Sequence, residues 1–312
     1  MKVSVIGAGN VGATCANVLA AKNFLDEVVL VDIKPNFAQG KALDIWESAP
    51  ILGFDTRVKG TTNDYTATAG SSVVVITSGV PRKPGMSRDD LISTNAAIVR
   101  SVTQQVMNYS PNAILVVVSN PLDVMTYTAY LTAGIPSHRV FGMAGVLDTG
   151  RYRAFLAEAL GVSPKDIQAM LMGGHGDTMV PLPRYTTVSG IPVTELLDPE
   201  TIERILERTR KGGGEIVNLL GTSAWYAPGA AAAEMVEAIV LNQKRILPVC
   251  ARLEGQYGED DLYIGVPVKL GRNGIEEIIE LALTEEEMAL FKESVMHVRR
   301  VMEALPKLLD NA

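Results

Sequence analysis

The sequence has little of several features that mark special classes of protein. Its 312 residues include two cysteines, Cys15 and Cys250, which are too few for a disulfide framework. Both lie in apolar stretches, so we expect two buried, reduced thiols. No uninterrupted apolar run reaches the roughly 18 residues of a membrane span, because the nearest candidate, 227–241, contains a proline and two glutamates. The sequence therefore excludes a disulfide-stabilised domain and predicts no membrane-spanning segment.

Basic residues are also fewer than acidic ones. The chain has 35 acidic and 28 basic residues, a formal net charge of -7, which argues against a nucleic-acid partner. The N-terminus offers a single Lys2 before an apolar run and no visible cleavage site. We therefore expect no leader peptide and a cytoplasmic location.

Apolar residues are plentiful, at 47%, which is typical of a globular chain, and the length suggests two domains. In the first half, continuous apolar runs at 3–6, 28–31, 73–77 and 114–118 alternate with helical patterns such as 11–21. Such runs are typical of strands buried on both faces of a parallel sheet. This alternation predicts that the first half, residues 1–147, is a Rossmann domain with a doubly wound parallel sheet.

The second half, residues 148–312, has a different pattern and predicts an α+β substrate domain. Thr284 and Glu287 have the spacing of a capping box and open a helix that runs to about residue 305. Further helices are expected at 152–160, 202–220 and 230–241, short strands at 167–172 and 186–191, and an antiparallel pair at 247–253 and 262–270. The fold class is thus α/β, with two halves of different texture.

A G-x-G-x-x-G pattern follows the first expected strand and opens the first helix. Gly7 allows a tight turn, Gly9 lets the backbone approach a phosphate, and Gly12 lets the helix pack on the strand. Asp32 comes 20 residues after Gly12, where a carboxylate binds a ribose diol and repels a 2′-phosphate, which favours NAD over NADP. The alternative is a structural glycine turn beside a solvated aspartate. No G-K-[S/T] follows, so a Walker-type site is excluded.

Histidines are scarce, and one of the three stands apart. His138 lies in an expected loop and His297 in the C-terminal helix, so both are expected at the surface. His175 lies in the segment Gly-Gly-His-Gly-Asp at 173–177, where glycines leave the imidazole open to a ligand. The alternative is a loop histidine without a chemical role.

Two pairs of charged residues complete the candidate site. Arg82 and Arg88 bracket a Pro- and Gly-rich loop just after an expected strand, where ligands bind in such sheets; alternatively they are solvated surface arginines. Asp148 and Arg151 stand one helical turn apart, which alone also fits a surface ion pair. Asn120 ends the strand expected at 114–118, at the same edge of the sheet.

Five segments of the chain, taken together and in this order, resemble the lactate/malate dehydrogenase superfamily, and more narrowly its lactate-dehydrogenase-like bacterial malate dehydrogenases. They are residues 7–32, PRKPGMSR at 81–88, SNPLD at 119–123, GVLDTGR at 145–151 and GGHGD at 173–177. The resemblance covers essentially the whole chain, and five motifs at matching spacings are far more specific than the glycine loop alone.

The resemblance implies a role for each polar residue of the candidate site. His175 would take the proton from the 2-hydroxyl of the substrate, and Asp148 would orient that imidazole. Arg151 would bind the C1 carboxylate bidentately. Arg88 would polarise the carbonyl as the loop closes, and Asn120 would hydrogen-bond the substrate.

Arg82 would select the substrate. The lactate enzymes typically have Gln at this position, whereas Arg favours the second carboxylate of malate or oxaloacetate. The resemblance also implies NAD as cofactor, no metal, and a cis peptide bond before Pro121. The residues implied to contact NAD are Gly7, Ala8, Gly9, Asn10, Val11, Gly12, Asp32, Asn95, Val118, Ser119 and Asn120.

A helix expected at 39–49 bears on assembly. Ala42, Ile45, Trp46 and Ala49 form an apolar stripe, which by pattern alone is more often core than interface. The resemblance favours a subunit interface, and we expect a homo-oligomer, a homotetramer rather than a homodimer.

The activity implied by the resemblance is NAD-dependent interconversion of malate and oxaloacetate, a reaction of the tricarboxylic acid cycle. One alternative is a dehydrogenase for another 2-hydroxy acid such as lactate, against which Arg82 argues. The other is a non-catalytic NAD-binding protein, against which the intact set of His175, Asp148, Arg88 and Arg151 argues. In the family, residues 222–228 close the substrate pocket, and the sequence leaves open which of them touches substrate or whether Trp225 only packs between the domains.

Overall fold

A computed structural model describes residues 1–81, 87–176 and 178–309, except for the side chains of residues 88, 304 and 306–309. The strands are β1 (Lys2–Ile6), β2 (Glu27–Asp32), β3 (Arg57–Thr62), β4 (Val73–Ile76), β5 (Ile114–Val117), β6 (Val140–Gly142), β7 (Ile167–Gln168), β8 (Leu171–Gly173), β9 (Met179–Pro181), β10 (Thr187–Val188), β11 (Ile191–Pro192), β12 (Arg245–Glu254), β13 (Asp260–Gly271) and β14 (Gly274–Ile278). The helices are α1 (Asn10–Ala21), α2 (Phe37–Glu47), α3 (Ala49–Leu52), α4 (Arg88–Tyr109), α5 (Leu122–Ala133), α6 (Gly145–Leu160), α7 (Val193–Leu196), α8 (Pro199–Leu220), α9 (Tyr226–Val240) and α10 (Glu285–Leu309).

The first half forms the parallel sheet that the apolar runs predicted. Its strands lie in the order β3-β2-β1-β4-β5-β6, and every neighbouring pair is parallel. All four residues of β4 and of β5 are buried, because helices cover both faces of the sheet. This confirms the Rossmann prediction and places the reversal of strand order between β1 and β4.

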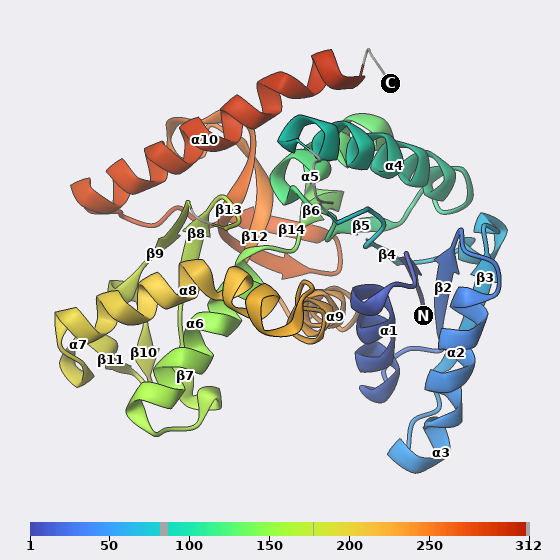
Figure 1. The fold of residues 1–312 in the computed structure, drawn as a ribbon, viewed down its shortest axis with the longest axis horizontal. Coiled ribbons are helices and arrows are strands. Elements are labelled where there is room, and N and C mark those ends of the chain that lie inside the picture. The colour runs from blue at the N-terminus through green and yellow to red at the C-terminus, as the bar shows by residue number, and fades with distance from the viewer. Residues whose placement is uncertain (82–86, 177, 310–312) are drawn as a thin grey trace.

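The second half continues the same sheet rather than building a separate one. In the described part of the chain, β12, β13, β8 and β9 extend the sheet beyond β6 with antiparallel pairing, and β14 pairs with β13. Figure 1 shows α4, α5 and α10 together on one side of this sheet and α1, α6 and α9 on the other. The predicted antiparallel pair at 247–253 and 262–270 is confirmed as β12 and β13.

Two predicted strands of the second half were wrong in detail. The run at 167–172 is divided between β7, which pairs in a small three-stranded sheet with β10 and β11, and β8, which pairs in the large sheet. The run at 186–191 is a hairpin of β10 and β11, turned by Ser189 and Gly190, both at positive φ. Apolar runs indicated burial, but they could not show which sheet each part joins.

The predicted helices are present with shifted bounds, and two of the shifts bear on the assembly and on the division into domains. The helix expected at 39–49 is α2 followed by α3, with a break at Ser48 because Pro50 has no N–H to continue the ladder. Ala42, Ile45 and Ala49 of its stripe are buried within the chain, as the pattern alone suggested, and Trp46 is half-buried beneath Arg57. The subunit interface that the resemblance favours stays a prediction. The helix expected at 152–160 begins at Gly145 as α6, so it spans the point at which we divided the domains.

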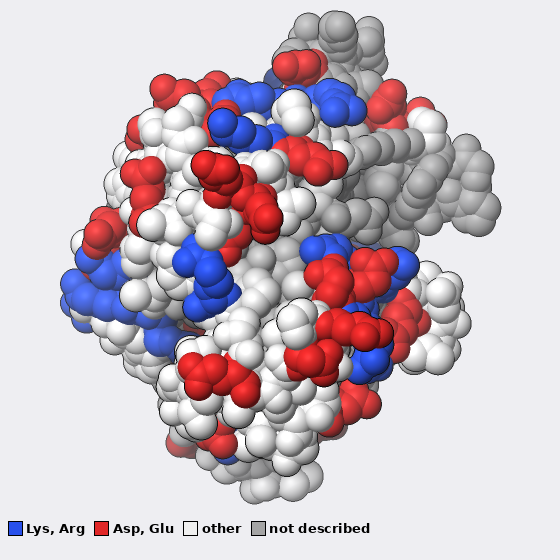
Figure 2. Space-filling model, turned by 90° about the vertical axis from the view of Figure 1, so that its left-hand side faces the viewer, with Lys and Arg blue, Asp and Glu red and all other residues white. Residues whose placement is uncertain are grey.

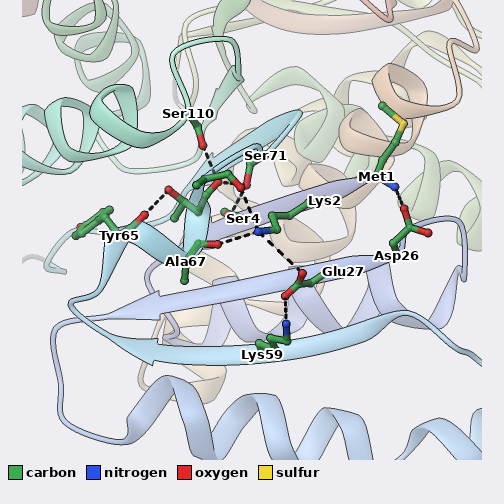
Figure 3. A network of polar contacts seen from close by, with 12 residues as sticks. Met1, Lys2, Ser4, Asp26, Glu27, Lys59, Tyr65, Ala67, Ser71 and Ser110 are labelled. Atoms are coloured by element: carbon green, nitrogen blue, oxygen red, sulfur yellow. Dashed lines mark hydrogen bonds and ion pairs between the residues drawn. The ribbon is translucent and has the colours of Figure 1, made fainter.

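Polar contacts close the N-terminal edge of the parallel sheet (Figure 3). The ammonium group of Lys2 donates to the carbonyl of Ala67 at 3.1 Å, and the hydroxyls of Ser4 and Ser71 lie 2.8 Å apart in a buried pair. These bonds hold β1 against the segment that leads into β4.

Two smaller predictions are confirmed. Cys15 and Cys250 are buried free thiols. Thr284 and Glu287 form the capping box at the start of α10, where each backbone N–H is bound by the other's side chain at 2.9 and 3.2 Å.

Acidic and basic side chains alternate on the face of the molecule drawn in Figure 2, without a broad field of either sign. Of the helices that the structure describes, none has the length and apolar character needed to cross a bilayer.

Candidate active site

The glycine loop connects β1 to α1 at the carboxyl edge of the sheet. Gly7 has a φ of 103° and donates its N–H to the carbonyl of Val31 at 2.7 Å. A Cβ at Gly12 would lie 1.9 Å from the carbonyl oxygen of Gly7, so α1 can pack this closely only on a glycine. A Cβ at Gly9 would meet nothing within 4 Å. The loop is therefore tight against the protein at Gly12 and open at Gly9.

The first turn of α1 provides an anion site of the kind expected for a pyrophosphate. Asn10 and Val11 begin the helix, and no side chain of the described residues caps it. The N–H groups of such a turn have no partner within the helix. Together with the open space at Gly9, these residues fit a dinucleotide phosphate.

Asp32 ends β2 beside this loop. Its Oδ2 accepts the N–H of Ala8 at 2.7 Å, and its Oδ1 accepts the N–H of Lys34 at 2.9 Å. Each carboxylate oxygen keeps a further lone pair. The half-buried carboxylate is thus fixed by backbone donors and can still accept hydrogen bonds from a ribose diol.

The loops after β4 and β5 meet at the same edge. The side-chain amide of Asn95, in α4, accepts the N–H of Val80 at 2.8 Å and donates to the carbonyl of Asn120 at 2.7 Å. The hydroxyl of Ser119 donates to the carbonyl of Ser78 at 2.5 Å. Asn95 is buried, so its side chain holds the two loops together; its predicted contact with the cofactor stays a prediction.

The end of β5 supplies the remaining residues predicted at this edge. Val118 donates its N–H to the carbonyl of Ile76 at 2.8 Å and is buried. The side chain of Asn120 is exposed, and the Asn120–Pro121 bond is cis, which confirms that prediction. Asn120 therefore lies at the carboxyl edge with its amide free to face a ligand on the solvent side.

His175, Asp148 and Arg151 are brought together in one chain of hydrogen bonds. Asp148 and Arg151 lie in the first two turns of α6, and His175 follows β8. The Nδ1 of His175 lies 2.8 Å from Oδ2 of Asp148, whose Oδ1 accepts from a guanidinium nitrogen of Arg151 at 3.2 Å. Because an ionised carboxylate only accepts, Nδ1 of a neutral His175 carries the hydrogen and Nε2 has the free lone pair.

The electrostatics of this group favour proton exchange at the imidazole. The carboxylate of Asp148 raises the pKa of His175 most strongly, its hydrogen bond and Asp123 raise it further, and burial and Arg151 oppose the rise. The His175 side chain is 23% exposed, whereas that of Asp148 is 3% exposed. The arrangement therefore has a buried, orienting carboxylate and a base that solvent or substrate can reach.

The position of Arg151 depends on Gly212, to which sequence reasoning assigned no role. A Cβ at Gly212, in the middle of α8, would lie 2.2 Å from Cδ of Arg151. The arginine lines a cavity of about 420 Å³ between α6, α8 and α9, together with Glu215 and Ala227. Ala227 is thus the member of the 222–228 stretch that reaches this cavity. The GGG run at 212–214 was the available signal for the close approach of α8.

Trp225 lies elsewhere. It lines a smaller cavity of about 180 Å³ with Asn10 of α1 and Ile45 of α2, so it faces residues of the first half and not the cavity beside Arg151. His138 is exposed, as expected.

The side chains of two predicted substrate residues, Arg82 and Arg88, cannot be placed. Arg82 lies outside the described residues, as does Asp177 of the histidine segment. The backbone of Arg88 begins α4, but its side chain is outside the described set. In the described part of the chain, no three His, Cys, Asp or Glu side chains are grouped as metal ligands.

Sequence reasoning assigned no role to Asp123, which is buried and hydrogen-bonded to the backbone N–H of His175 at 3.4 Å. The available signal was an aspartate two residues after Pro121, in the segment that follows a buried strand.

Comparisons with known proteins cover the whole of this architecture. Residues 1–142 match the family model of the lactate/malate dehydrogenase NAD binding domain, and residues 145–307 match that of the alpha/beta C-terminal domain. The malate dehydrogenase of Cytophaga hutchinsonii is 66% identical over 312 residues, which are 100% of both chains.

Solved structures agree. The malate dehydrogenase of Salinibacter ruber has a TM-score of 0.96 at 60% identity and covers 100% of this chain and 99% of its own. A lactate dehydrogenase of Cryptosporidium parvum, solved with lactic acid and NAD, has a TM-score of 0.93 at 41% identity and covers 100% of this chain and 98% of its own.

Proposed function

The chain belongs to the lactate/malate dehydrogenase family, and we propose that it is an NAD-dependent malate dehydrogenase that interconverts (S)-malate and oxaloacetate. The observation that carries the proposal is the hydrogen-bonded chain of His175, Asp148 and Arg151. The full-length identity of 66% to a malate dehydrogenase supports the choice of substrate.

The cofactor residues fit NAD. The open space at Gly9, the uncapped start of α1 and the carboxylate of Asp32 beside the loop match a pyrophosphate followed by a ribose diol. We assign cofactor contacts to Gly7, Ala8, Gly9, Asn10, Val11, Gly12, Asp32, Asn95, Val118, Ser119 and Asn120. NAD, when bound, accepts a hydride from C2 of malate.

The residues of the chain provide the proton chemistry. In malate oxidation, Nε2 of His175 takes the proton of the 2-hydroxyl as C2 loses its hydride, and in oxaloacetate reduction it returns that proton. Asp148 holds the imidazole in the tautomer with hydrogen on Nδ1 and stabilises the imidazolium that forms.

Arginines bind and polarise the substrate. Arg151 binds the C1 carboxylate, for which its planar guanidinium is suited. Arg88 stabilises the negative charge that develops on the carbonyl oxygen, and Asn120 donates to the substrate from the strand edge.

Arg82 selects malate over lactate by pairing with the second carboxylate. Pyruvate would leave this guanidinium without a partner in a closing site, and removal of one partner of a buried pair costs ~3–5 kcal/mol. We expect discrimination of about 10²-fold, at the lower end of this range.

We further propose that the protein is a cytoplasmic homotetramer of the tricarboxylic acid cycle, with residues 1–147 as the NAD-binding domain and 148–312 as the catalytic domain. Exposed apolar side chains on α2 and α3 support a subunit interface there: Leu43, Ile51 and Leu52 are 57%, 83% and 58% exposed. A monomeric mass in solution would refute the assembly.

Parallel assays test the function. Purified protein with NADH should oxidise it rapidly on addition of oxaloacetate and at least tenfold more slowly with pyruvate. Arg82→Gln, which keeps a polar side chain but removes the charge, should narrow that ratio. Equal rates with pyruvate would transfer the assignment to a lactate-type enzyme, and no oxidation with either would favour a non-catalytic NAD-binding protein.

A further inference from the structure

Asp123 is a buried carboxylate that the reaction proposed above does not use. It is the second residue of α5 and is 9% exposed. Its Oδ2 accepts the backbone N–H of His175 at 3.4 Å, and its Oδ1 accepts the thiol of Cys250, in β12, at 3.2 Å. One side chain therefore joins α5, β12 and the segment that carries the candidate base.

The fold makes room for this contact. Gly142 in β6 pairs directly with Cys250 in β12. A Cβ at Gly142 would lie 2.5 Å from Oγ1 of Thr126, one turn after Asp123, and 3.1 Å from Cβ of Cys250. Without a side chain at position 142, α5 and β12 approach closely enough for the carboxylate and the thiol to meet.

The charge states of these groups suit a carboxylate held by a neutral thiol. Burial raises the pKa of Asp123 to about 6, while Cys250 and His175 oppose that rise. Burial, with Asp123, raises the pKa of the Cys250 thiol well above its usual value. Between pH 7 and 8 Asp123 is therefore ionised and Cys250 is a donor.

Among the described residues, the charged groups that act on the imidazole of His175 are Asp148, Asp123 and Arg151. Asp148 binds the imidazole directly, whereas Asp123 binds the backbone of the same residue. The two carboxylates act on the base through different atoms.

We propose that Asp123 and Cys250 form a positioning pair for His175, in which Asp123 holds the backbone amide and places a second negative charge near the imidazole, and the buried thiol of Cys250 holds that carboxylate by donating a hydrogen bond to it. The inference rests on the proposed function, because His175 is the proton acceptor there. A structural link between α5 and β12 without influence on the base is the alternative that the test must separate.

The first test follows the titration of His175 directly. The chain has three histidines, so the imidazole signals can be followed by NMR with ¹³C-labelled histidine, and His175→Asn identifies the signal of interest. Asp123→Asn keeps the shape of the side chain and removes its charge, so the His175 midpoint should move to lower pH. This readout needs no turnover. If the wild-type protein failed to oxidise NADH with oxaloacetate, the proposed function would fall, and the titration would still test the pair.

Kinetics give a signature that lost packing cannot produce. Malate oxidation requires neutral His175, so its rate falls at low pH as the imidazole is protonated. In Asp123→Asn this acidic limb of the pH–rate profile should move to lower pH. The rate on that limb should then rise about two- to fivefold relative to the plateau. Oxaloacetate reduction requires the imidazolium, so its basic limb should also move to lower pH, and the rate there should fall by a similar factor. Lower plateaus with unmoved limbs in both directions would overturn the proposal.

Variants of Cys250 test the other half of the pair. Cys250→Ala removes the donor and raises the pKa of Asp123, so the His175 midpoint should move in the same direction as in Asp123→Asn but less far. Cys250→Ser restores a donor and should restore the midpoint, and Cys15→Ala, at the other buried thiol, should leave it unchanged. If Asp123→Asn did not fold, this series would carry the test alone. A Cys250→Ala protein that titrates like the wild type would overturn the role of the thiol.

Discussion

The cofactor loop depends on residues without side chains, whereas the proton-transfer group depends on charged side chains in contact. The loop works through what its residues lack: Gly12 lets α1 pack against the backbone of Gly7, and Gly9 leaves space for a phosphate. The proton-transfer group works through side chains, with His175 and Asp148 in a hydrogen bond 2.8 Å long. The loop should therefore be sensitive to added volume, whereas the proton-transfer group should tolerate an isosteric replacement but not the loss of charge.

The largest effect on catalysis is expected from Asp148→Asn, which keeps the volume of the side chain and removes its charge. We expect kcat to fall about 10²–10⁴-fold, because the amide no longer fixes the tautomer of His175 or stabilises the imidazolium. Asp148 raises the pKa of His175, so its loss lowers that pKa, and the acidic limb of malate oxidation moves to lower pH. Rates measured from pH 5 to 9 check both effects.

The control for charge is Asp55→Asn, at an exposed aspartate, which should leave kcat and the pH profile unchanged. An Asp148→Asn enzyme with wild-type kcat would remove the orienting role from Asp148.

Added volume in the loop is the next test. In Gly12→Ala the new methyl group would lie 1.9 Å from the oxygen of Gly7, so we expect a loss of about 1–3 kcal/mol in the free energy of unfolding and weaker NADH binding. Gly9→Ala meets nothing within 4 Å, so stability should be kept while NADH affinity falls about tenfold or more, because the methyl group occupies the phosphate space. Denaturant melts and NADH fluorescence titrations separate the two. Equal stability losses at both positions would contradict the distinction.

A smaller effect is expected at Arg151, a charged side chain whose position depends on a glycine, Gly212. Gly212→Ala would place a methyl group 2.2 Å from Cδ of Arg151 and should raise KM for oxaloacetate about tenfold, with a smaller change in kcat. Gly213→Ala, at the next position of α8, meets open space. It should leave KM unchanged and add about 0.5–1 kcal/mol of stability, since alanine favours the helix more than glycine does. A KM unaffected by Gly212→Ala would show that Arg151 does not need this close approach.

The sequence predicted the parts of the fold whose signals are local. Four strands of the parallel sheet, β1, β2, β4 and β5, are the apolar runs that the sequence showed, and the βαβ order leaves few ways to arrange such runs. The edge strand β3 has the polar sequence RVKGTT and was not predicted, nor was the short β6. The glycine loop and Asp32 were predicted for the same reason, since strand, turn, helix and carboxylate follow one another in about 30 residues. His175 and Asp148 were paired through the family resemblance, and the hydrogen bond between them agrees with that pairing.

What the sequence could not predict depends on contacts between distant segments. The run at 167–172 is apolar except for Gln168, yet its two ends join different sheets. Asp123 and Cys250 are 127 residues apart, and Gly212 and Arg151 also lie on different helices. No periodicity in either segment indicates its partner, so these contacts appear only when the chain is folded.

The most direct measurement of the central claim is NADH oxidation with oxaloacetate by His175→Asn, beside His138→Asn as a control at an exposed histidine. The account predicts that His175→Asn binds NADH like the wild type and loses about 10³–10⁴-fold in kcat, while His138→Asn keeps full activity. A His175→Asn protein that binds NADH and still reduces oxaloacetate at a rate near that of the wild type would contradict the account.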